Sequence, residues 1–232
     1  MFSDVFTAVT ARELSVYRPE KTAYLSCHLS ACGAGLTNLP LTLPENSLIL
    51  VDDSMPPNGH DKDFIAGQLQ DLVQKFSPQA VLLDFQNPPT GESRALCAAI
   101  AKALPCPVGI TLPCAKELGC PVFLAPPPVN TALNTYLSPW LQWGVFLEIA
   151  PQAQKFTVTD TGCVSVPIPF HTAGSLPFTQ ETLHCHYDVT VTPKKAVFTL
   201  KRTGEDLDCL AKQAYRLGVL GVVGLYQELH NL

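Results

Sequence analysis

The sequence predicts an α/β protein whose strands close into a compact (β/α)8 barrel of the TIM type. Its length of 232 residues suits one domain with a sizeable core, and 47% of the residues are hydrophobic against 15% charged. Short apolar runs rich in β-branched residues alternate with helix-like stretches, which is typical of a parallel sheet with crossover helices. Eight such runs are present, the number that closes a barrel. We therefore expect residues 1–232 to form a single barrel domain.

Eight segments are expected as barrel strands because each is a short apolar run bounded by turn residues. They span residues 22–30, 47–53, 80–86, 107–113, 121–127, 144–150, 196–202 and 221–229. Helices are expected where apolar residues recur at helical spacing, which is at residues 64–76, 93–104 and 204–218. The other crossovers are short or irregular, so we expect an imperfect barrel with reduced outer helices. They lie at residues 31–46, 114–120 and 129–143.

The pattern changes between the sixth and seventh expected strands. Residues 152–195 contain two stretches in which apolar and polar residues alternate, KFTVTDTGCVSVPI and HCHYDVTVTP, separated by a loop with Gly and Pro. Such alternation is typical of antiparallel strands with one exposed face. We therefore expect an inserted β-hairpin at this point of the barrel.

Charge and hydropathy patterns exclude several classes of protein. The net charge is −5 and basic residues cluster only in pairs such as Lys194-Lys195, so no nucleic-acid surface is predicted. Residues 1–20 lack a basic start and a continuous apolar run, and the longest apolar runs elsewhere are strand-sized. We therefore expect neither a secretory signal nor a membrane span. Nine cysteines without regular spacing suit reduced thiols, which predicts a cytoplasmic protein.

Polar residues gather at the expected carboxyl ends of the strands. In a parallel barrel these ends meet at one rim, where barrel enzymes place their catalytic and binding groups. The residues are Asp52, Asp53, Asp84, Gln86, Glu148, Lys201, Arg202, Gln227 and Glu228. Two interpretations stay open, a polar binding site and an ordinary solvated rim. Trp143, just before a strand, suits stacking on a sugar ring and packing in the core equally well.

One strand carries a resemblance to a known family. AVLLDFQNP resembles the fourth-strand signature D-x-x-D-x-D-x-E of glycoside hydrolase family 18, the chitinase-like barrels. The match lies at Asp84, at the aromatic Phe85 and at the Asn-Pro pair that follows. The sequence departs from the signature at Gln79 and Leu82, which stand in the places of the first two acids. It departs again at Gln86, in the place of the Glu.

Three longer segments are similar to parts of the same family, and the resemblance covers residues 45–232. DKDFIAGQLQDLVQKFSPQ is similar to the helix that leads into the family's fourth strand. GVFLEIAPQAQKFTVTDTG resembles its seventh strand with the turn into an inserted segment. LAKQAYRLGVLGVVGLYQEL resembles its last helix and last strand, as in its spore-associated members.

The resemblance implies a carbohydrate ligand and gives roles to Asp84 and Gln86. In the family the Glu protonates the glycosidic oxygen, while the neighbouring Asp orients the substrate's own acetamido group as the nucleophile. A Gln amide has no proton to give at neutral pH. We therefore expect a bacterial carbohydrate-binding pseudoenzyme with weak or no hydrolysis and no cofactor. The candidate substrate-binding residues are Asp53, Trp143, Gln227 and Glu228.

Two other functions stay open. Glu148 ends an apolar strand, where burial would raise its pKa enough for it to act as an acid. With Asp53, Asp84 or Glu228 as its partner, it would make the chain an active hydrolase of another barrel class. Alternatively, the barrel is a non-catalytic structural protein of a spore or envelope layer, because a fold does not fix a function.

Histidines in two expected strands are considered as metal ligands or as core residues. His184, His186 and Asp188 alternate along an expected strand, and two histidines with a carboxylate at this spacing can bind zinc or iron. Such matches are common by chance in exposed hairpins, so no metal is predicted. His28, within the first expected strand, is expected in the core.

Overall fold

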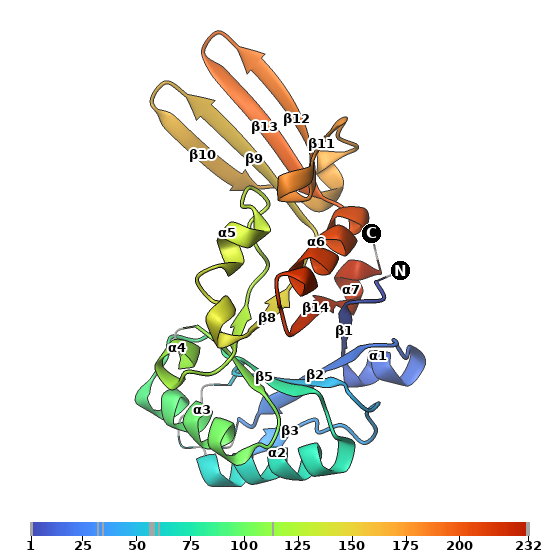
Figure 1. Cartoon of the computed structure of the whole chain (residues 1–232), viewed down its shortest axis with the longest axis vertical. Helices are drawn as coiled ribbons and strands as arrows, with labels where there is room; N and C mark the ends of the chain where they lie inside the picture. The colour runs from blue at the N-terminus through green and yellow to red at the C-terminus, as the bar shows by residue number, and fades with distance from the viewer. Residues whose placement is uncertain are drawn as a thin grey trace.

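The chain folds into a closed barrel of parallel strands, and a second, antiparallel sheet projects from one end of it (Figure 1). The computed structural model describes residues 2–31, 33, 35–55, 59, 61–112 and 114–230. The barrel strands are β1 (Phe6–Val9), β2 (Thr22–Leu29), β4 (Leu48–Asp52), β5 (Ala80–Asp84), β6 (Val108–Thr111), β7 (Val122–Leu124), β8 (Val145–Glu148) and β14 (Gly221–Leu225). Each pairs in parallel with the next, and β14 pairs with β1 to close the barrel. The predicted (β/α)8 fold class is confirmed.

Helices follow most of the barrel strands, and several of them are short. They are α1 (Ala11–Val16), α2 (Lys62–Phe76), α3 (Gly91–Ala103), α4 (Cys114–Leu118), α5 (Leu133–Leu137), α6 (Gly204–Arg216) and α7 (Tyr226–Leu229). After β2 the chain forms β3 (Leu36–Thr37), which pairs antiparallel with β2. The crossover before β8 adds a 3-10 turn, η1 (Leu141–Trp143). The predicted reduction of the outer helices is confirmed. Within the described ranges, none of the helices has the length and apolar character needed to cross a membrane.

The two long helices before and after β5 have side-chain caps that fix where they begin. The Asp61 carboxylate accepts hydrogen bonds from the amides of Asp63 and Phe64 at the start of α2. Thr90 and Ser93 exchange side-chain hydrogen bonds at the start of α3. These caps satisfy amides that have no partner within the helix, and the Thr90 cap fixes where the loop after β5 ends.

One segment that is expected as a barrel strand does not belong to the barrel, and one actual barrel strand is not expected from the sequence. The segment 196–202 lies in β13 (Lys195–Arg202), which pairs antiparallel on both sides and belongs to the projecting sheet. Its alternation of apolar and polar residues is typical of such a strand. The eighth barrel strand is instead β1, whose FTAV sequence is too short to show a period. Its place between β14 and β2 buries it completely.

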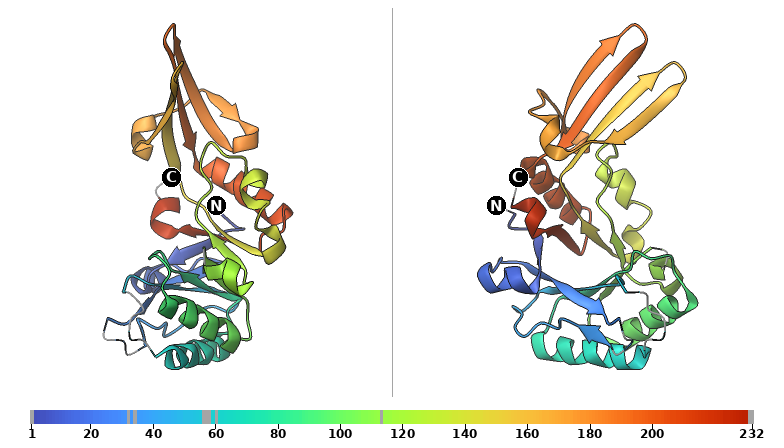
Figure 2. Two further views of the ribbon diagram at one scale, coloured as in Figure 1. Left: turned by 90° about the vertical axis from the view of Figure 1, so that its left-hand side faces the viewer. Right: turned by 180° about the vertical axis from the view of Figure 1, so that it is seen from behind.

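The projecting sheet follows β8, which lies in the 144–150 segment after which an insertion is expected, and β8 is the seventh barrel strand because β1 precedes the expected ones. It has five strands in the order β10-β9-β13-β12-β11 instead of a single hairpin. They are β9 (Gln152–Thr159), β10 (Gly162–Pro167), β11 (Phe178–Gln180), β12 (Cys185–Thr192) and β13. Two short 3-10 turns, η2 (Phe170–Ala173) and η3 (Glu181–Leu183), lie between these strands. Figure 2 shows from two further sides that the two long hairpins extend well beyond the barrel.

A buried arginine fixes this sheet to the barrel. Arg202, at the end of β13, is 1% exposed and therefore does not belong to a solvated rim. Its guanidinium donates to the carbonyl oxygens of Pro127 at 2.7 Å and Leu183 at 3.0 Å, and its Nε donates to that of His184 at 3.2 Å. Pro127 lies in the loop after β7, so one side chain holds the sheet against the barrel rim.

The core has two layers separated by the barrel wall. Side chains that point outward from the strands pack under the helices and form the larger cluster. Side chains that point inward fill the barrel itself. The buried members of this interior cluster are Phe6, Ala8, Ala23, Leu48, Leu50, Ala80, Leu82, Phe123, Phe146 and Val223. The interior is thus a packed core, so a ligand has access only to the rim.

Candidate functional site

Inward-facing residues change from apolar to polar at the carboxyl end of the barrel. Leu82 of β5 and Phe146 of β8 belong to the barrel interior. Side chains alternate along a strand, so Asp84 and Glu148, two residues further on, point to the same side of their strands. The rim therefore carries carboxylates directly above the apolar interior.

These carboxylates lie in one cavity of about 230 Å³. It is formed where β5, β6, β7 and β8 end, and α5 contributes one side of it. Its polar and aromatic residues are Asp84, Phe85, Gln86, Thr111, Phe123, Tyr136 and Glu148. Three residues predicted as catalytic from the sequence, Asp84, Gln86 and Glu148, are thus found in one cavity. Their catalytic role stays a prediction.

Asp84 is held by Gln86, the residue two positions further along the chain. The amide Nε2 of Gln86 donates to Oδ1 of Asp84 at 2.5 Å. Burial raises the pKa of Asp84, the Gln86 hydrogen bond opposes this, and the nearby Asp52 and Asp53 raise it further. β5 is the fourth strand around the barrel, the position that the resemblance of AVLLDFQNP implies.

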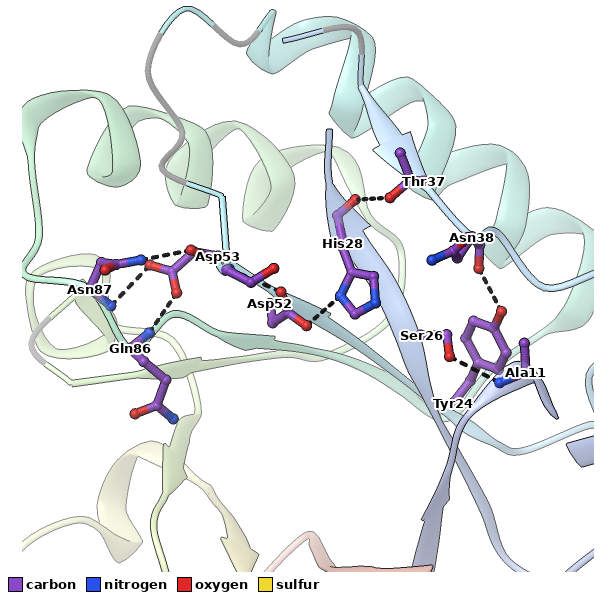
Figure 3. A network of polar contacts seen from close by, with 11 residues as sticks. Ala11, Tyr24, Ser26, His28, Thr37, Asn38, Asp52, Asp53, Gln86 and Asn87 are labelled. Atoms are coloured by element: carbon purple, nitrogen blue, oxygen red, sulfur yellow. Dashed lines mark hydrogen bonds and ion pairs between the residues drawn. The ribbon is translucent and has the colours of Figure 1, made fainter. Parts of the chain in front are cut away.

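Asp53 positions the loop that carries Gln86, as Figure 3 shows. Asp53 is only 3% exposed, and its carboxylate accepts hydrogen bonds from the backbone amides of Gln86 at 2.8 Å and Asn87 at 3.1 Å. The Asn87 side chain donates in return to the Asp53 carbonyl oxygen at 2.6 Å. With both its oxygens engaged by amides, Asp53 holds the loop of the site in place. Its role in substrate binding or as a partner acid stays a prediction.

Glu148 is the carboxyl group in the cavity that is best suited to carry a proton. Burial is the main reason that its pKa is raised to about 7, and Asp84 and Glu228 add to the effect. A group with this pKa is about half protonated at neutral pH. Tyr136, beside it, donates its hydroxyl to the Ala125 carbonyl oxygen at 2.9 Å, so its ring is fixed at the cavity wall.

Gln227 and Glu228 follow β14 and begin α7, and they have different environments. Gln227 donates from Nε2 to Oε1 of Glu13 in α1 at 3.0 Å, so it links two elements of the rim. Glu228 raises the pKa of Glu148, which places it near that carboxyl group. Its Oε2 is buried without a hydrogen-bond partner among the described residues, and burial raises its own pKa.

Trp143 does not lie with the other candidates. It belongs to η1, just before β8, whereas Glu148 ends that strand. It is therefore at the opposite end of the barrel, where it packs against the outer core. The packing interpretation is the one that this position supports.

The expectation that His28 lies in the core is wrong. Its Nδ1 lies 2.5 Å from Oδ2 of Asp52, its side chain is 33% exposed, and Asp52 is opposite Asp84 in the strand register (Figure 3). A register irregularity between Tyr24 and Cys27 in β2 reverses the alternation and turns His28 inward. His28 therefore lies at the rim beside Asp52, which is the neighbour of Asp84 in the register.

The histidines of the projecting sheet are engaged separately. His184 precedes β12 with φ of 48° and contacts Gln213 of α6. His186 contacts Asp206 through Nδ1 at 3.0 Å, and Asp188 accepts from the amide of Val189. The part of the chain that the structure describes contains no group of three or more His, Cys, Asp or Glu residues arranged to hold a metal.

Comparison with known proteins gives a match at the level of fold. A family 18 chitinase from Cycas revoluta, in complex with (GlcNAc)3, has a TM-score of 0.58 at 10% identity, over 95% of this chain and 94% of that one. A family 18 N-acetylglucosaminidase from Paenibacillus barengoltzii has 0.56 at 10% identity, over 98% of each chain. The spore cortex-lytic enzyme SleL of Bacillus megaterium has 0.53 at 10% identity, over 95% of this chain and 70% of that one.

No family model matches the chain, and no curated protein matches it. The likeness is therefore one of architecture, and it includes nearly the whole chain. The chain has the (β/α)8 barrel fold of glycoside hydrolase family 18, which the resemblance of its β5 segment predicts.

Proposed function

We propose that the rim cavity binds an N-acetylglucosamine-containing oligosaccharide and that the chain does not hydrolyse it by the family 18 route. The observation that carries this proposal is the Asp84–Gln86 pair in the cavity, in which the Gln86 amide donates a hydrogen bond to the Asp84 carboxylate. The pair offers a sugar both an amide and a carboxylate for hydrogen bonding. The neighbouring Tyr136 and Phe123 supply aromatic surface at the same cavity.

The environment of β5 supports the loss of hydrolysis. Leu82, in the place of the second acid of the signature, is 0% exposed and belongs to the barrel interior. Gln79, in the place of the first, lies at the other end of the strand and donates to the carbonyl oxygen of Leu220. Gln86 has an amide where the family has its proton donor. Of the four acidic positions of the signature, Asp84 alone carries an acid in this chain.

Titration calorimetry with (GlcNAc)3 tests the binding proposal, with cellotriose as the comparison ligand without acetamido groups. We expect binding of (GlcNAc)3 that Asp84→Asn and Gln86→Ala each weaken by about tenfold, or about 1.4 kcal/mol. Gln79→Ala is the matched control, because Gln79 belongs to the same segment but lies at the far end of the strand. Absence of binding by the unaltered chain, or equal weakening by the control, refutes the proposal.

Glu148 favours a second candidate function, a hydrolase in which this residue is the acid. Its pKa of about 7 and its place beside Asp84 are the observations in favour. In that case hydrolysis of aryl glycosides should survive Gln86→Ala and disappear in Glu148→Gln. Hydrolysis that survives both changes refutes this candidate, and binding without any turnover leaves the first proposal in place.

We also propose that the protein works in a reducing compartment, the cytoplasm. All eight cysteines within the described ranges are free thiols, and Cys27, Cys97, Cys114 and Cys185 are buried. Titration of the unfolded chain with a thiol reagent, without reductant, should recover all nine cysteines. A stable deficit of two thiols refutes the proposal.

A further inference from the structure

The carboxyl groups of the rim cavity have oxygens that no protein group engages. Asp84 accepts a hydrogen bond from Gln86 through Oδ1, and its Oδ2 has no partner among the described residues. Neither oxygen of Glu148 accepts a hydrogen bond from the described part of the chain. Both side chains line the cavity, so three carboxyl oxygens are available to a ligand that donates hydrogen bonds.

The donors of the same cavity are mostly engaged by the protein. Thr111 and Tyr136 each have one hydroxyl proton, and each gives it to a backbone carbonyl oxygen, at 2.7 and 2.9 Å. Gln86 gives one of its two amide hydrogens to Asp84. While Glu148 is ionised, the described lining residues therefore leave a ligand one side-chain donor, the second N–H of Gln86.

The charge of this cavity is not balanced by a cation of the described chain. The described lining residues include no Lys, Arg or His, and no ion pair of the described residues involves Asp84 or Glu148. The charged groups that raise the pKa of Glu148 are the acids Asp84 and Glu228. Partly buried carboxylates without a counter-charge are costly, so a cationic ligand would supply an interaction that the protein does not.

We propose that the sugar unit in the rim cavity carries a free ammonium group, so that the preferred ligand is an oligosaccharide that contains glucosamine. The inference rests on the proposed function for the saccharide and adds which nitrogen group the cavity selects. An ammonium has three donors and no acceptor, which fits three unengaged carboxyl oxygens, and its hydrogen bonds to carboxylates are charge-assisted. An acetamido oxygen needs a donor instead, and the described side chains of the cavity offer one N–H, that of Gln86.

Two features make an amino sugar a better fit than a metal ion. Within the described ranges, no three His, Cys, Asp or Glu residues are arranged to hold a metal. Phe123 and Tyr136 supply aromatic surface, which suits the apolar face of a sugar ring. The cavity volume of about 230 Å³ lies below the roughly 300–1,000 Å³ of pockets for drug-sized ligands, so the cavity holds a small part of an oligosaccharide.

Glu148 gives the preference a pH dependence of defined sign. The titratable groups that act on it or are acted on by it are Asp84 from β5, Glu228 from α7 and Tyr136 from α5, and Tyr136 stays neutral because its pKa is raised. Between pH values of about 5 and 6.5 Glu148 increasingly ionises, while an amine is still charged. The affinity for an ammonium sugar should therefore increase severalfold over this interval, and the affinity for an acetamido sugar should not.

Titration calorimetry at a pH of about 6.5 and low salt compares the deacetylated trimer (GlcN)3 with (GlcNAc)3. We expect (GlcN)3 to bind at least about tenfold more tightly. Glu148→Gln keeps the shape of the side chain and removes its charge. It should weaken binding of (GlcN)3 about tenfold and change binding of (GlcNAc)3 less than about twofold. Glu45→Gln, which removes an exposed carboxylate from a loop, should change neither.

A cationic peptide separates this selectivity from the general attraction between an acidic protein and a polycation. The net charge of −5 attracts any polycation at low salt. Trilysine carries positive charges without a sugar ring, so it should bind at least about tenfold more weakly than (GlcN)3.

Three results overturn the inference: equal affinity for (GlcN)3 and (GlcNAc)3, equal weakening by Glu148→Gln and Glu45→Gln, and trilysine binding as tight as that of (GlcN)3. If (GlcNAc)3 binds and (GlcN)3 is not preferred, the inference fails and the proposed function stands. If (GlcN)3 binds and (GlcNAc)3 does not, the inference stands and the proposed ligand is corrected. Binding of neither trimer ends both.

Discussion

Replacement of Glu148 by Gln should stabilise the fold at neutral and alkaline pH, although Glu148 lies in the proposed binding cavity. Burial, together with Asp84 and Glu228, raises the pKa of Glu148 from 4.5 to about 7. Each pKa unit corresponds to about 1.36 kcal/mol. The interval from 4.5 to about 7 therefore costs the folded chain about 3 kcal/mol once the carboxyl group is ionised in both states.

The direction of the pH dependence follows from the protons bound. Between pH 4.5 and about 7 the folded chain keeps a proton on Glu148 that the unfolded chain has released, so stability falls as the pH rises through this window. At lower pH both states are protonated and the cost is absent. A Gln side chain does not ionise, so the variant lacks this fall.

Urea unfolding of both proteins at pH values of about 4.5, 6 and 8 measures the effect. We expect Glu148→Gln and the unaltered chain to be equally stable near pH 4.5, and the variant to be more stable by about 3 kcal/mol near pH 8. Glu45→Gln, in an exposed loop, is the control for loss of one negative charge. Parallel pH profiles, or a variant that is less stable near pH 8, would refute the account of a buried and uncompensated carboxylate.

Three further changes test how the fold supports the site. Arg202→Met removes the buried anchor of the projecting sheet and should lower the free energy of unfolding by about 2–5 kcal/mol in urea titrations. Asp53→Ala, which frees the Gln86 loop, should cost about 1–3 kcal/mol and weaken (GlcNAc)3 binding, whereas Asp71→Ala on the exposed side of α2 should do neither. Gly109→Ala would bring its Cβ within 2.7 Å of a core side chain and should lower the melting temperature through about 1–3 kcal/mol of strain. Gly91→Ala, where nothing lies within 4 Å, should not.

The sequence predicts the barrel well where a strand is a continuous buried run. The segments around β4, β5 and β8 are apolar on both faces because helices cover one side and the barrel interior fills the other. The period-two pattern of β13 instead indicates an antiparallel strand with one exposed face. A count of apolar runs does not use this difference and treats β13 as one more barrel strand. β1 is the barrel strand that the sequence does not predict, because four residues are too few to show a pattern and its neighbours define it as a strand.

The site was predictable where residues follow a strand end, and not where a local irregularity decides the direction of a side chain. Asp84 and Glu148 end apolar runs, so their place at the rim follows from parallel strands alone. His28 depends on the irregularity in β2, which leaves no mark in the alternation of TAYLSCHLS. Asp53 looks like any rim acid in the sequence, and only its bonds to two amides show that it supports a loop.

The residues along β5 also determine where the electrostatic cost of the site lies. A carboxylate at position 82 would stand inside an apolar barrel, where an unpaired charge costs several kcal/mol, and Leu82 removes that cost by completing the interior core. The neutral Gln86 likewise places no second negative charge beside Asp84 and donates a hydrogen bond to it instead. The remaining electrostatic cost lies at Glu148 and Glu228. Glu148 has a pKa of about 7, and Glu228 has a buried oxygen without a hydrogen-bond partner among the described residues. If the rim performs chemistry, these two carboxyl groups are where the fold retains the means for it.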